Sequence, residues 1–411
     1  MKLRAGMAVS QAVADLKNLD NVIDWVEPNY LVGKTDLVPA KRLTAPSRRK
    51  LVGVAPRKAL PAAVAKMIQA GAATNDPQFS GQWSLSNIGQ NGGNYGSDIK
   101  VQGAWGVTTG DRRTTVAIID TGLDVSHSDL KANVFRNLRE FNGTAALDDD
   151  QNGYVDDRIG WNFVANTNNV TDDNGHGTHM AGIVAAVGNN NVGISGVMWN
   201  ASILPLKALD AQGTGTISDV VEAIDYAIAQ KVSVILCAFG TDGNSKALKE
   251  AIDRAAMSGI IVVTSAGNDG QNLHDSPQFP ACYTSLNLLT VAASGNTDNI
   301  ATFSNYGQGA HIAAPGVDIL TTGIGDTYGN ITGSSASAAL GAGVAGLLKS
   351  LRPWVSAQAV RASIVQGARQ LGWLNGNVSS SGILSASEAI EQFLAMPEDE
   401  RHHPCRQLHR A

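Results

Sequence analysis

The chain has 411 residues, of which 43% are hydrophobic and 16% charged, enough apolar sequence for one large domain or for a few smaller ones. The formal net charge of −5 gives no reason to expect nucleic acid or an anionic membrane as a partner. The cysteines are odd in number, which excludes a framework in which every cysteine is paired within the chain. No apolar run approaches the roughly 18 residues that a membrane span needs, and the first residues lack the apolar core of a secretion signal, so we expect neither.

The first part of the chain divides into two segments of different character. Residues 7–19 have a helical pattern and residues 22–32 a strand pattern, so we expect a helix followed by a strand within residues 1–33. Residues 34–74 carry many Lys and Arg side chains among Pro and Ala, without a clear period before about residue 60. This composition predicts a basic linker that a protease can reach.

From residue 75 the predicted elements alternate regularly between strands and helices, and we expect one domain over residues 75–394. Short runs rich in Val and Ile predict strands over residues 115–119, 202–206, 233–237, 260–264 and 288–292. Helical patterns cover residues 176–187, 216–230, 245–258, 335–351 and 356–366. Continuously apolar strands that alternate with helices indicate a mainly parallel sheet covered on both faces, which is a three-layer α/β/α fold. A polar tail over residues 395–411 follows.

Three polar residues stand where this pattern allows chemistry. Asp120 directly follows the strand predicted over residues 115–119, at the edge where open α/β sheets place their sites. His176 lies between two glycines, which leave room for a general base to approach a substrate. Ser335 begins a helix of small residues, and the N–H groups at a helix N-terminus suit a forming oxyanion. Asp, His and Ser in this chain order are one known arrangement of a catalytic triad.

The same residues also have ordinary structural interpretations. Asp120 could be a turn or cap residue, and Ser335 could be a plain helix N-cap. Ser334 and Ser337 stand close by and could serve as the nucleophile instead. The hypothesis of a triad therefore depends on the three segments occurring together.

Two competing interpretations involve a cofactor. His176 and His179 could bind zinc, but they are three residues apart, the metalloprotease helix uses a spacing of four, and no Glu stands between them. Residues 341–346 match Gly-x-Gly-x-x-Gly, but no strand directly precedes them and residues 358–366 hold no acidic side chain. We therefore predict neither zinc nor a nicotinamide cofactor, and interpret residues 341–346 as close helix packing.

Two further segments offer polar groups. Asn268 follows the strand predicted over residues 260–264, where its amide could donate to an oxyanion or could only stabilise a turn. In residues 148–157, oxygen ligands alternate and a glycine turn follows, as in the first half of a calcium loop. The loop is not an EF-hand, because Ile159 stands where the final Glu would be, and acidic loops are often merely solvated. We predict a Ca²⁺ site with the ligands Asp148, Asp150, Asn152 and Asp157.

Together these segments resemble the subtilisin-like serine peptidases over roughly residues 75–394. The resemblance is carried by Asp120-Thr121-Gly122, Gly175-His176-Gly177-Thr178-His179, Ala266-Gly267-Asn268 and Gly333-Ser334-Ser335. It implies that Asp120 orients His176, that His176 acts as general base and then acid, and that Ser335 is the nucleophile. It also implies that Asn268 and the Ser335 N–H bind the oxyanion. Residues 26–30 are similar to the last strand of the family's inhibitory prodomain.

The resemblance further implies where a polypeptide substrate and a second calcium ion would bind. An extended peptide would pair with two strand edges, as in strand addition, and Ser265 and Gln278 would lie near the first specificity pocket. The predicted substrate-binding residues are Gly213, Thr214, Gly215, Ala238, Phe239, Gly240 and Ser265. The second calcium site would use Asp129, Asn189 and Asn190. We expect a secreted monomer, made as a precursor that is cut between residues 33 and 75.

The chain departs from the family pattern in three places. Residues 336–340 read Ala-Ser-Ala-Ala-Leu where the family usually has Met-Ala-Thr-Pro-His, and residues 237–240 read Cys-Ala-Phe-Gly where it has Met-Ser-Leu-Gly. Residues 1–33 match only the second half of the prodomain, which is too short for an independent core. We predict an active serine endopeptidase. The alternative is a catalytically silent member of the fold that binds its partner, which the altered residues 336–340 favour.

Overall fold

The computed structural model describes Val9, Val13 and residues 26–35 and 61–396. The helix predicted over residues 7–19 lies outside the described residues except for Val9 and Val13, and the polar tail lies outside them beyond Met396. Of the strand predicted over residues 22–32, residues 22–25 lie outside the described residues and residues 26–30 are not in a strand. Strand β1 begins at Leu31 and continues to Lys34.

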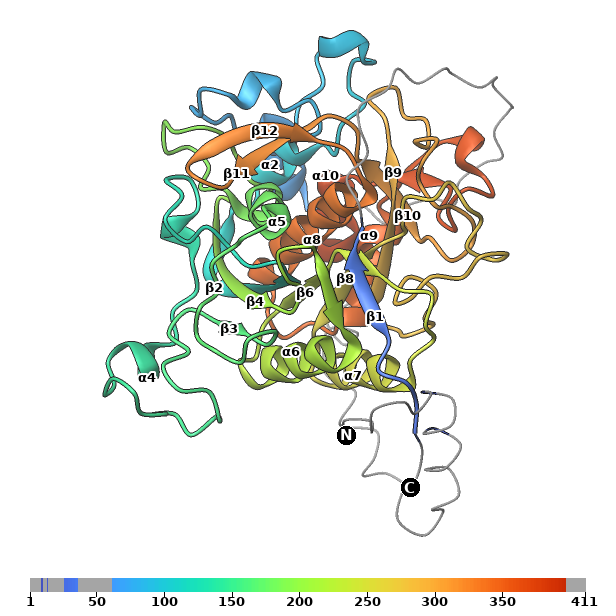
Figure 1. Cartoon of the computed structure of the whole chain (residues 1–411). Helices are drawn as coiled ribbons and strands as arrows, with labels where there is room; N and C mark the ends of the chain where they lie inside the picture. Colours follow the sequence, from blue (N-terminus) through green and yellow to red (C-terminus); the bar gives the residue numbers. More distant parts are fainter. Residues whose placement is uncertain (1–8, 10–12, 14–25, 36–60, 397–411) are drawn as a thin grey trace, which may run out of the picture.

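A nine-stranded sheet forms the middle layer of the molecule (Figure 1). Its strand order is β13-β14-β10-β9-β8-β6-β2-β4-β3, and every pairing is parallel except that of β13 with β14. The strands are β2 (Gly110–Asp120), β3 (Trp161–Asn162), β4 (Asn200–Lys207), β6 (Val234–Cys237), β8 (Ile261–Ser265), β9 (Leu288–Ser294), β10 (Ile312–Pro315), β13 (Arg369–Gln370) and β14 (Gly382–Ile383). Because parallel strands end at the same edge, the residues that follow β2, β6 and β8 come close together.

Helices cover both faces of this sheet. One face is packed by α3 (Val101–Trp105), α5 (His176–Ala185), α8 (Ser334–Leu351), α9 (Ala357–Gln366) and α10 (Ala386–Ala395), and the other by α6 (Ile217–Ala229) and α7 (Lys246–Met257). Along β6, Val234 and Leu236 belong to the core on the first face, whereas Ile235 and Cys237 belong to the core on the second. This alternation confirms the predicted three-layer α/β/α fold.

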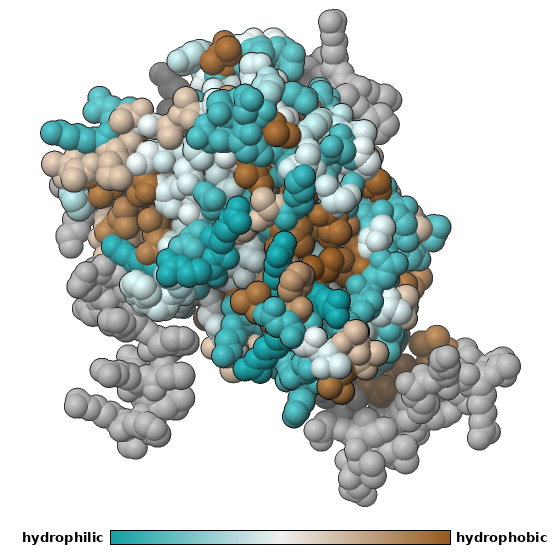
Figure 2. Space-filling view, turned by 90° about the vertical axis from the view of Figure 1, so that its left-hand side faces the viewer, coloured by the Kyte–Doolittle hydropathy of each residue, from teal (hydrophilic) through white to brown (hydrophobic). Residues whose placement is uncertain are grey.

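Most of the central strands and helices begin and end within one or two residues of the predicted positions. Sequence reasoning missed the hairpin of β11 (Ile319–Gly323) and β12 (Thr327–Ile331), together with β10 and α10. The remaining elements are short: α2 (Ala62–Ala70), α4 (Leu138–Phe141) and the 3-10 turns Phe79–Gly81, Gln90–Gly92, Lys131–Asn133 and Gly372–Leu374. Among the described residues, no helix is long and apolar enough to span a membrane. The face seen in Figure 2 mixes hydrophilic residues with separate apolar patches.

A second, small sheet is formed by a segment that is remote in sequence. Strand β1 (Leu31–Lys34) lies between β5 (Thr214–Thr216) and β7 (Phe239–Gly240) and is antiparallel to both. In Figure 1 it is the blue arrow labelled β1. Residues 31–34 are therefore part of the folded molecule.

Candidate active site

Asp120 and His176 form a buried hydrogen-bonded pair at the carboxyl edge of the sheet. Asp120 is the last residue of β2, and His176 is the first residue of α5, after Gly175 with a φ of 104°. The two Asp120 carboxylate oxygens lie 2.8 and 2.9 Å from His176 Nδ1. A neutral His176 therefore carries its proton on Nδ1 and presents an unprotonated Nε2, as a general base requires.

Glycine at two positions lets these two elements approach each other. A Cβ on Gly177 would lie 2.1 Å from the Gly122 carbonyl oxygen, and a Cβ on Gly122 would lie 2.5 Å from the Val170 oxygen. Neither position has room for a side chain. The glycines in the two sequence segments are thus needed for the Asp120–His176 contact.

Asp172 orders the loop before His176, a role that the sequence did not reveal. Its carboxylate accepts hydrogen bonds from the backbone N–H of Gly175 and Thr178 and from the hydroxyls of Thr121 and Thr178. Burial alone would raise the pKa of Asp172, but these hydrogen bonds outweigh it and hold the pKa below its usual value. Asp172 therefore links the segment after Asp120 to the first turn of α5.

Ser335 lies in the first turn of α8, and its hydroxyl points at the N-terminal segment. Ser335 Oγ lies 3.1 Å from the Thr35 carbonyl oxygen and 3.3 Å from the Ala238 carbonyl oxygen, and its single proton can go to either of them. His176 Nε2 is buried and has no hydrogen-bond partner among the described residues. The Ser335 hydroxyl would have to rotate toward His176 for proton transfer.

Asn268 lines the same cavity as Thr35. Its side-chain Oδ1 accepts the Ser334 N–H at 2.9 Å, which fixes the amide so that Nδ2 is the end able to donate to an oxygen. The N–H groups of the first turn of α8 have no acceptor within the helix. The Asn268 amide and the Ser335 N–H are groups of a kind that can donate to an oxyanion.

The two strands whose edges we predicted to bind substrate, β5 and β7, have β1 between them as the central strand of a three-stranded sheet. Val32 pairs with Gly215 and Gly33 with both Thr214 and Gly240. The Lys34 N–H donates to the Gly213 oxygen (2.8 Å) and the Thr35 N–H to the Ala238 oxygen (3.1 Å). All six predicted edge residues, Gly213, Thr214, Gly215, Ala238, Phe239 and Gly240, therefore lie along this segment, and Phe239 pairs with Lys34.

A cavity of about 720 Å³ opens beside Thr35, and of the two residues predicted near the first specificity pocket, Ser265 and Gln278, only Gln278 lines it. Gly267, Asp269 and Gln278 line it. Gln278 is held in place because its amide donates to Asp269 and accepts a hydrogen bond from Asn305. Ser265 also reaches this region, since its hydroxyl lies 2.6 Å from that of Thr35.

The predicted second calcium site brings together two buried carboxylates. Asp129 accepts hydrogen bonds from the Asn190 side chain and the Ile194 N–H, and Asp76 accepts the N–H groups of Asn189 and Asn190. Burial raises the pKa of Asp129, and the charge of Asp76 raises it further. Two carboxylates from separate segments that both contact residues 189–194 fit a divalent cation. Asp76 adds a ligand candidate that sequence reasoning missed.

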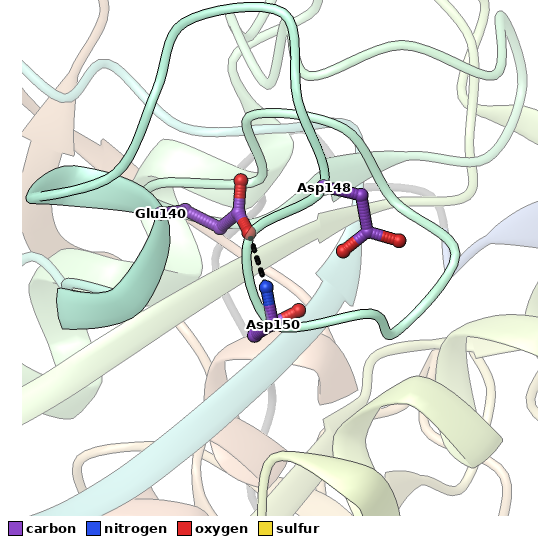
Figure 3. Close-up of side chains that lie close together, drawn as sticks. All are labelled: Glu140, Asp148 and Asp150. Atoms are coloured by element: carbon purple, nitrogen blue, oxygen red, sulfur yellow. Dashed lines mark hydrogen bonds between the residues drawn. The ribbon is translucent and has the colours of Figure 1, made fainter.

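Glu140 of α4 lies beside two of the predicted calcium ligands in the acidic loop of residues 148–157. Oxygen atoms of Glu140, Asp148 and Asp150 lie within 4.8 Å of one another, and Glu140 Oε1 accepts the Asp150 N–H at 3.0 Å (Figure 3). Hard oxygen ligands at this spacing fit Ca²⁺. The other two predicted ligands have different roles in this structure: the Asn152 amide donates to Asp157, and Asp157 also accepts from Asn137 and Tyr226. Burial raises the pKa of Asp157 despite these donors.

Comparison with known proteins identifies the family. Residues 111–383 match the Subtilase family, Peptidase_S8, which is more than half of the chain. This chain belongs to the subtilase family. It is 36% identical to thermitase of Thermoactinomyces vulgaris over 319 residues, which are 77% of this chain and 99% of that protein.

Two further relatives are longer than this chain. It is 37% identical to the thermophilic serine proteinase of Bacillus sp. (strain AK1) over 274 residues, or 66% of this chain and 61% of the relative. It is 32% identical to subtilisin-like protease 1 of Plasmodium falciparum (isolate 3D7) over 296 residues, which are 67% of this chain and 43% of the relative. The chain therefore spans about half the length of these subtilase relatives.

Proposed function

We propose that this subtilase is a serine endopeptidase that uses Asp120, His176 and Ser335. The observation that carries the proposal is the contact of the Thr35 carbonyl group with Ser335 Oγ, at the end of a strand that is paired on both sides. The buried Asp120–His176 pair lies at the same sheet edge, because Ile119 pairs with Cys237, the residue before Ala238. A peptide substrate would be held in the same way. A relative named thermophilic serine proteinase and another named subtilisin-like protease 1 support the proposal.

Acylation follows from this geometry. Ser335 Oγ attacks the carbonyl carbon while its proton passes to His176 Nε2, and Asp120 stabilises the imidazolium through Nδ1–H. The negative charge that forms on the carbonyl oxygen is stabilised by Asn268 Nδ2 and the Ser335 N–H. The C–N bond then breaks, and His176 gives its proton to the leaving amine. Water, deprotonated by His176, hydrolyses the resulting Ser335 ester and restores the free hydroxyl.

We also propose that the chain is a precursor cut between residues 33 and 75, with residues 1–33 acting as its prodomain. The support is the position of β1, which fills the groove that a substrate would need. The family resemblance supports a secreted monomer. Location and oligomeric state stay predictions.

The decisive test is labelling with a fluorophosphonate, compared between the purified chain and Ser335→Ala, with mass spectrometry of the N-terminus. Labelling at Ser335, and trimming within residues 33–75 only when Ser335 is present, is the expected result. A folded chain that is never labelled and never trimmed would contradict the proposal and favour the silent binding protein.

Calcium is the structural ion that we propose for both acidic sites. The oxygen-only donor sets of Glu140, Asp148 and Asp150 and of Asp76 and Asp129 support this. A bound Ca²⁺ would offset the repulsion between neighbouring carboxylates and so stabilise the folded state. We expect a calcium chelator to lower the thermal midpoint by several degrees. Excess Ca²⁺ should restore the midpoint and Mg²⁺ should not, and an unchanged midpoint would contradict the assignment.

A further inference from the structure

Thr35 is held at its backbone on both sides and at its side chain. Its N–H donates to the Ala238 oxygen, its carbonyl oxygen accepts from Ser335, and its hydroxyl lies 2.6 Å from that of Ser265. Only 8% of Thr35 is exposed. These contacts place Thr35 as the residue whose carbonyl carbon Ser335 would attack.

Ser265 is the polar group at the base of this position. It is the last residue of β8 and is 3% exposed. If the side chain at position 35 had no hydroxyl, the buried Ser265 hydroxyl would have neither a protein partner nor water as its partner. Leaving a buried hydroxyl unpaired costs more free energy than a typical hydrogen bond contributes to stability. A side chain of the same shape without a hydroxyl would therefore fill this position but leave the Ser265 hydroxyl without a hydrogen-bond partner.

We infer that this site selects peptides with a β-hydroxyl residue, Thr or Ser, immediately before the cleaved bond, and that Ser265 recognises the hydroxyl. The bond that follows Thr35 is then the chain's own bond of this kind, and it lies within the segment expected to be cut. The inference rests on the proposed peptidase function.

The residues before Thr35 define the rest of the preferred peptide. Val32 is 1% exposed and packs in the core that contains α6. Gly33 is paired to a strand on each side. The stem of Lys34 lies against Gly213, and its Nζ donates to Asn174 Oδ1 at 3.1 Å. The segment presents an apolar residue, a glycine, a lysine and then the hydroxyl residue.

The first experiment follows processing of the whole chain by intact-mass spectrometry. The wild type and Thr35→Ser should both yield a fragment that begins at Asp36, whereas Thr35→Val should yield it about tenfold more slowly. Val has the shape of Thr without the hydroxyl, so the comparison isolates the hydrogen bond. Processing of Thr35→Val at the wild-type rate, or a wild-type fragment that begins elsewhere, overturns the inference.

The second experiment uses the processed enzyme and peptides that span residues 30–38, with Thr, Val or Leu at position 35. We expect kcat/KM for the Thr peptide to exceed that for the Val peptide about tenfold in the wild type. The ratio should fall close to one in Ser265→Ala, mainly because the Thr peptide becomes slower. Ser363→Ala, a buried serine change on α9, should keep the wild-type ratio.

These outcomes separate the inference from the proposed function. If the Leu peptide is cleaved faster than the Thr peptide, or if Ser265→Ala keeps the tenfold ratio while its thermal midpoint matches the wild type, the hydroxyl preference is wrong but the peptidase function stands. If Ser335 is never labelled and no peptide is cleaved, the proposed function itself fails.

Discussion

At the scale of single residues, the site is built from side chains whose partners fix their orientation before a substrate arrives. Asp120 fixes the tautomer of His176, and the Ser334 N–H fixes the amide of Asn268. Such fixed dipoles stabilise charge in a transition state without a cost of reorganisation at the moment of reaction.

Asn268→Ala tests this arrangement directly. We expect kcat to fall about 10²–10³-fold, the loss known for removal of the corresponding kind of donor in subtilisin, with a much smaller effect on KM. The reason is that, in the proposed mechanism, the amide would donate to the oxyanion and only weakly to the ground-state carbonyl. Steady-state kinetics on the peptide of residues 30–38 measure the split. A variant that changes KM alone would assign Asn268 to substrate binding.

The sequence was informative for some of these residues and silent for others. Asp120 and His176 could be predicted because the glycines beside them are required by local backbone contacts, which leave a readable pattern. Asp172 could not, since its role is to accept hydrogen bonds from residues that only the fold brings together. Thr35 lies at the start of a segment without periodicity, and its importance comes from contact with residues more than two hundred positions away.

At the scale of elements, the central helix α8 shows why a nucleotide-like glycine pattern occurs without a nucleotide. A Cβ on Gly343 would lie 2.5 Å from Val197 Cβ, and one on Gly346 would lie 2.2 Å from Met198 Sδ. The glycines let α8 pack directly on the segment before β4. This supports the interpretation of residues 341–346 as a packing surface.

Gly343→Ala should therefore destabilise the fold. We expect the free energy of unfolding to fall by about 1–3 kcal/mol, because the Cβ of Val197 cannot move aside without the backbone. Gly341→Ala is the matched control in the same helix, since its Cβ would meet the end of the Val291 side chain at 3.1 Å. Urea unfolding measures both variants. Equal effects of the two substitutions would mean that helix propensity, and not packing, dominates.

A buried histidine next to β10 predicts acid sensitivity at this edge of the sheet. His311 Nδ1 accepts the Thr290 N–H at 2.8 Å, and burial, with a contribution from Arg361, lowers the pKa of His311 to about 3. Its folded pKa lies below the unfolded value of about 6.5, so the stability it contributes is complete above that pH and is lost as the pH falls. For this one group, the free energy of unfolding should fall by up to about 1.4 kcal/mol for each pH unit.

His311→Asn isolates this group, because an amide oxygen can accept the Thr290 N–H but does not titrate. Between about pH 6 and pH 4, unfolding free energies should fall less steeply in the variant than in the wild type. Other titrating groups act equally in both proteins. Parallel curves would show that His311 does not contribute to the acid sensitivity.

At the scale of the whole molecule, residues 26–35 join parts that the sequence keeps far apart. Besides the strand pairing of β1, Asn29 accepts the Ser218 N–H at the start of α6. Glu27 accepts the Lys246 N–H (2.7 Å) and the Ala247 N–H (3.2 Å) at the start of α7. The segment thus caps the helices of one layer and fills the groove beside the catalytic groups. The alternation of strands and helices in the sequence predicted the layers. That residues 26–35 contact both α6 and α7 and the strands β5 and β7 could be found only in the structure.

The Glu27 cap gives the last prediction, which concerns release of the cleaved segment. A carboxylate at a helix N-terminus accepts N–H groups that have no other partner in the helix and is favoured by the helix dipole. Once the chain is cut, Glu27→Ala should weaken the hold of the segment on the groove about tenfold to a hundredfold, so the processed enzyme should cleave added peptide faster. Glu27→Gln keeps one acceptor oxygen but loses the charge, and it should lie between the wild type and Glu27→Ala. The measurement is inhibition of each processed enzyme by its own retained segment, titrated by dilution. If all three proteins regain activity at the same dilution, the cap contributes to folding of α7 alone, and β1 must hold the segment by its strand pairing.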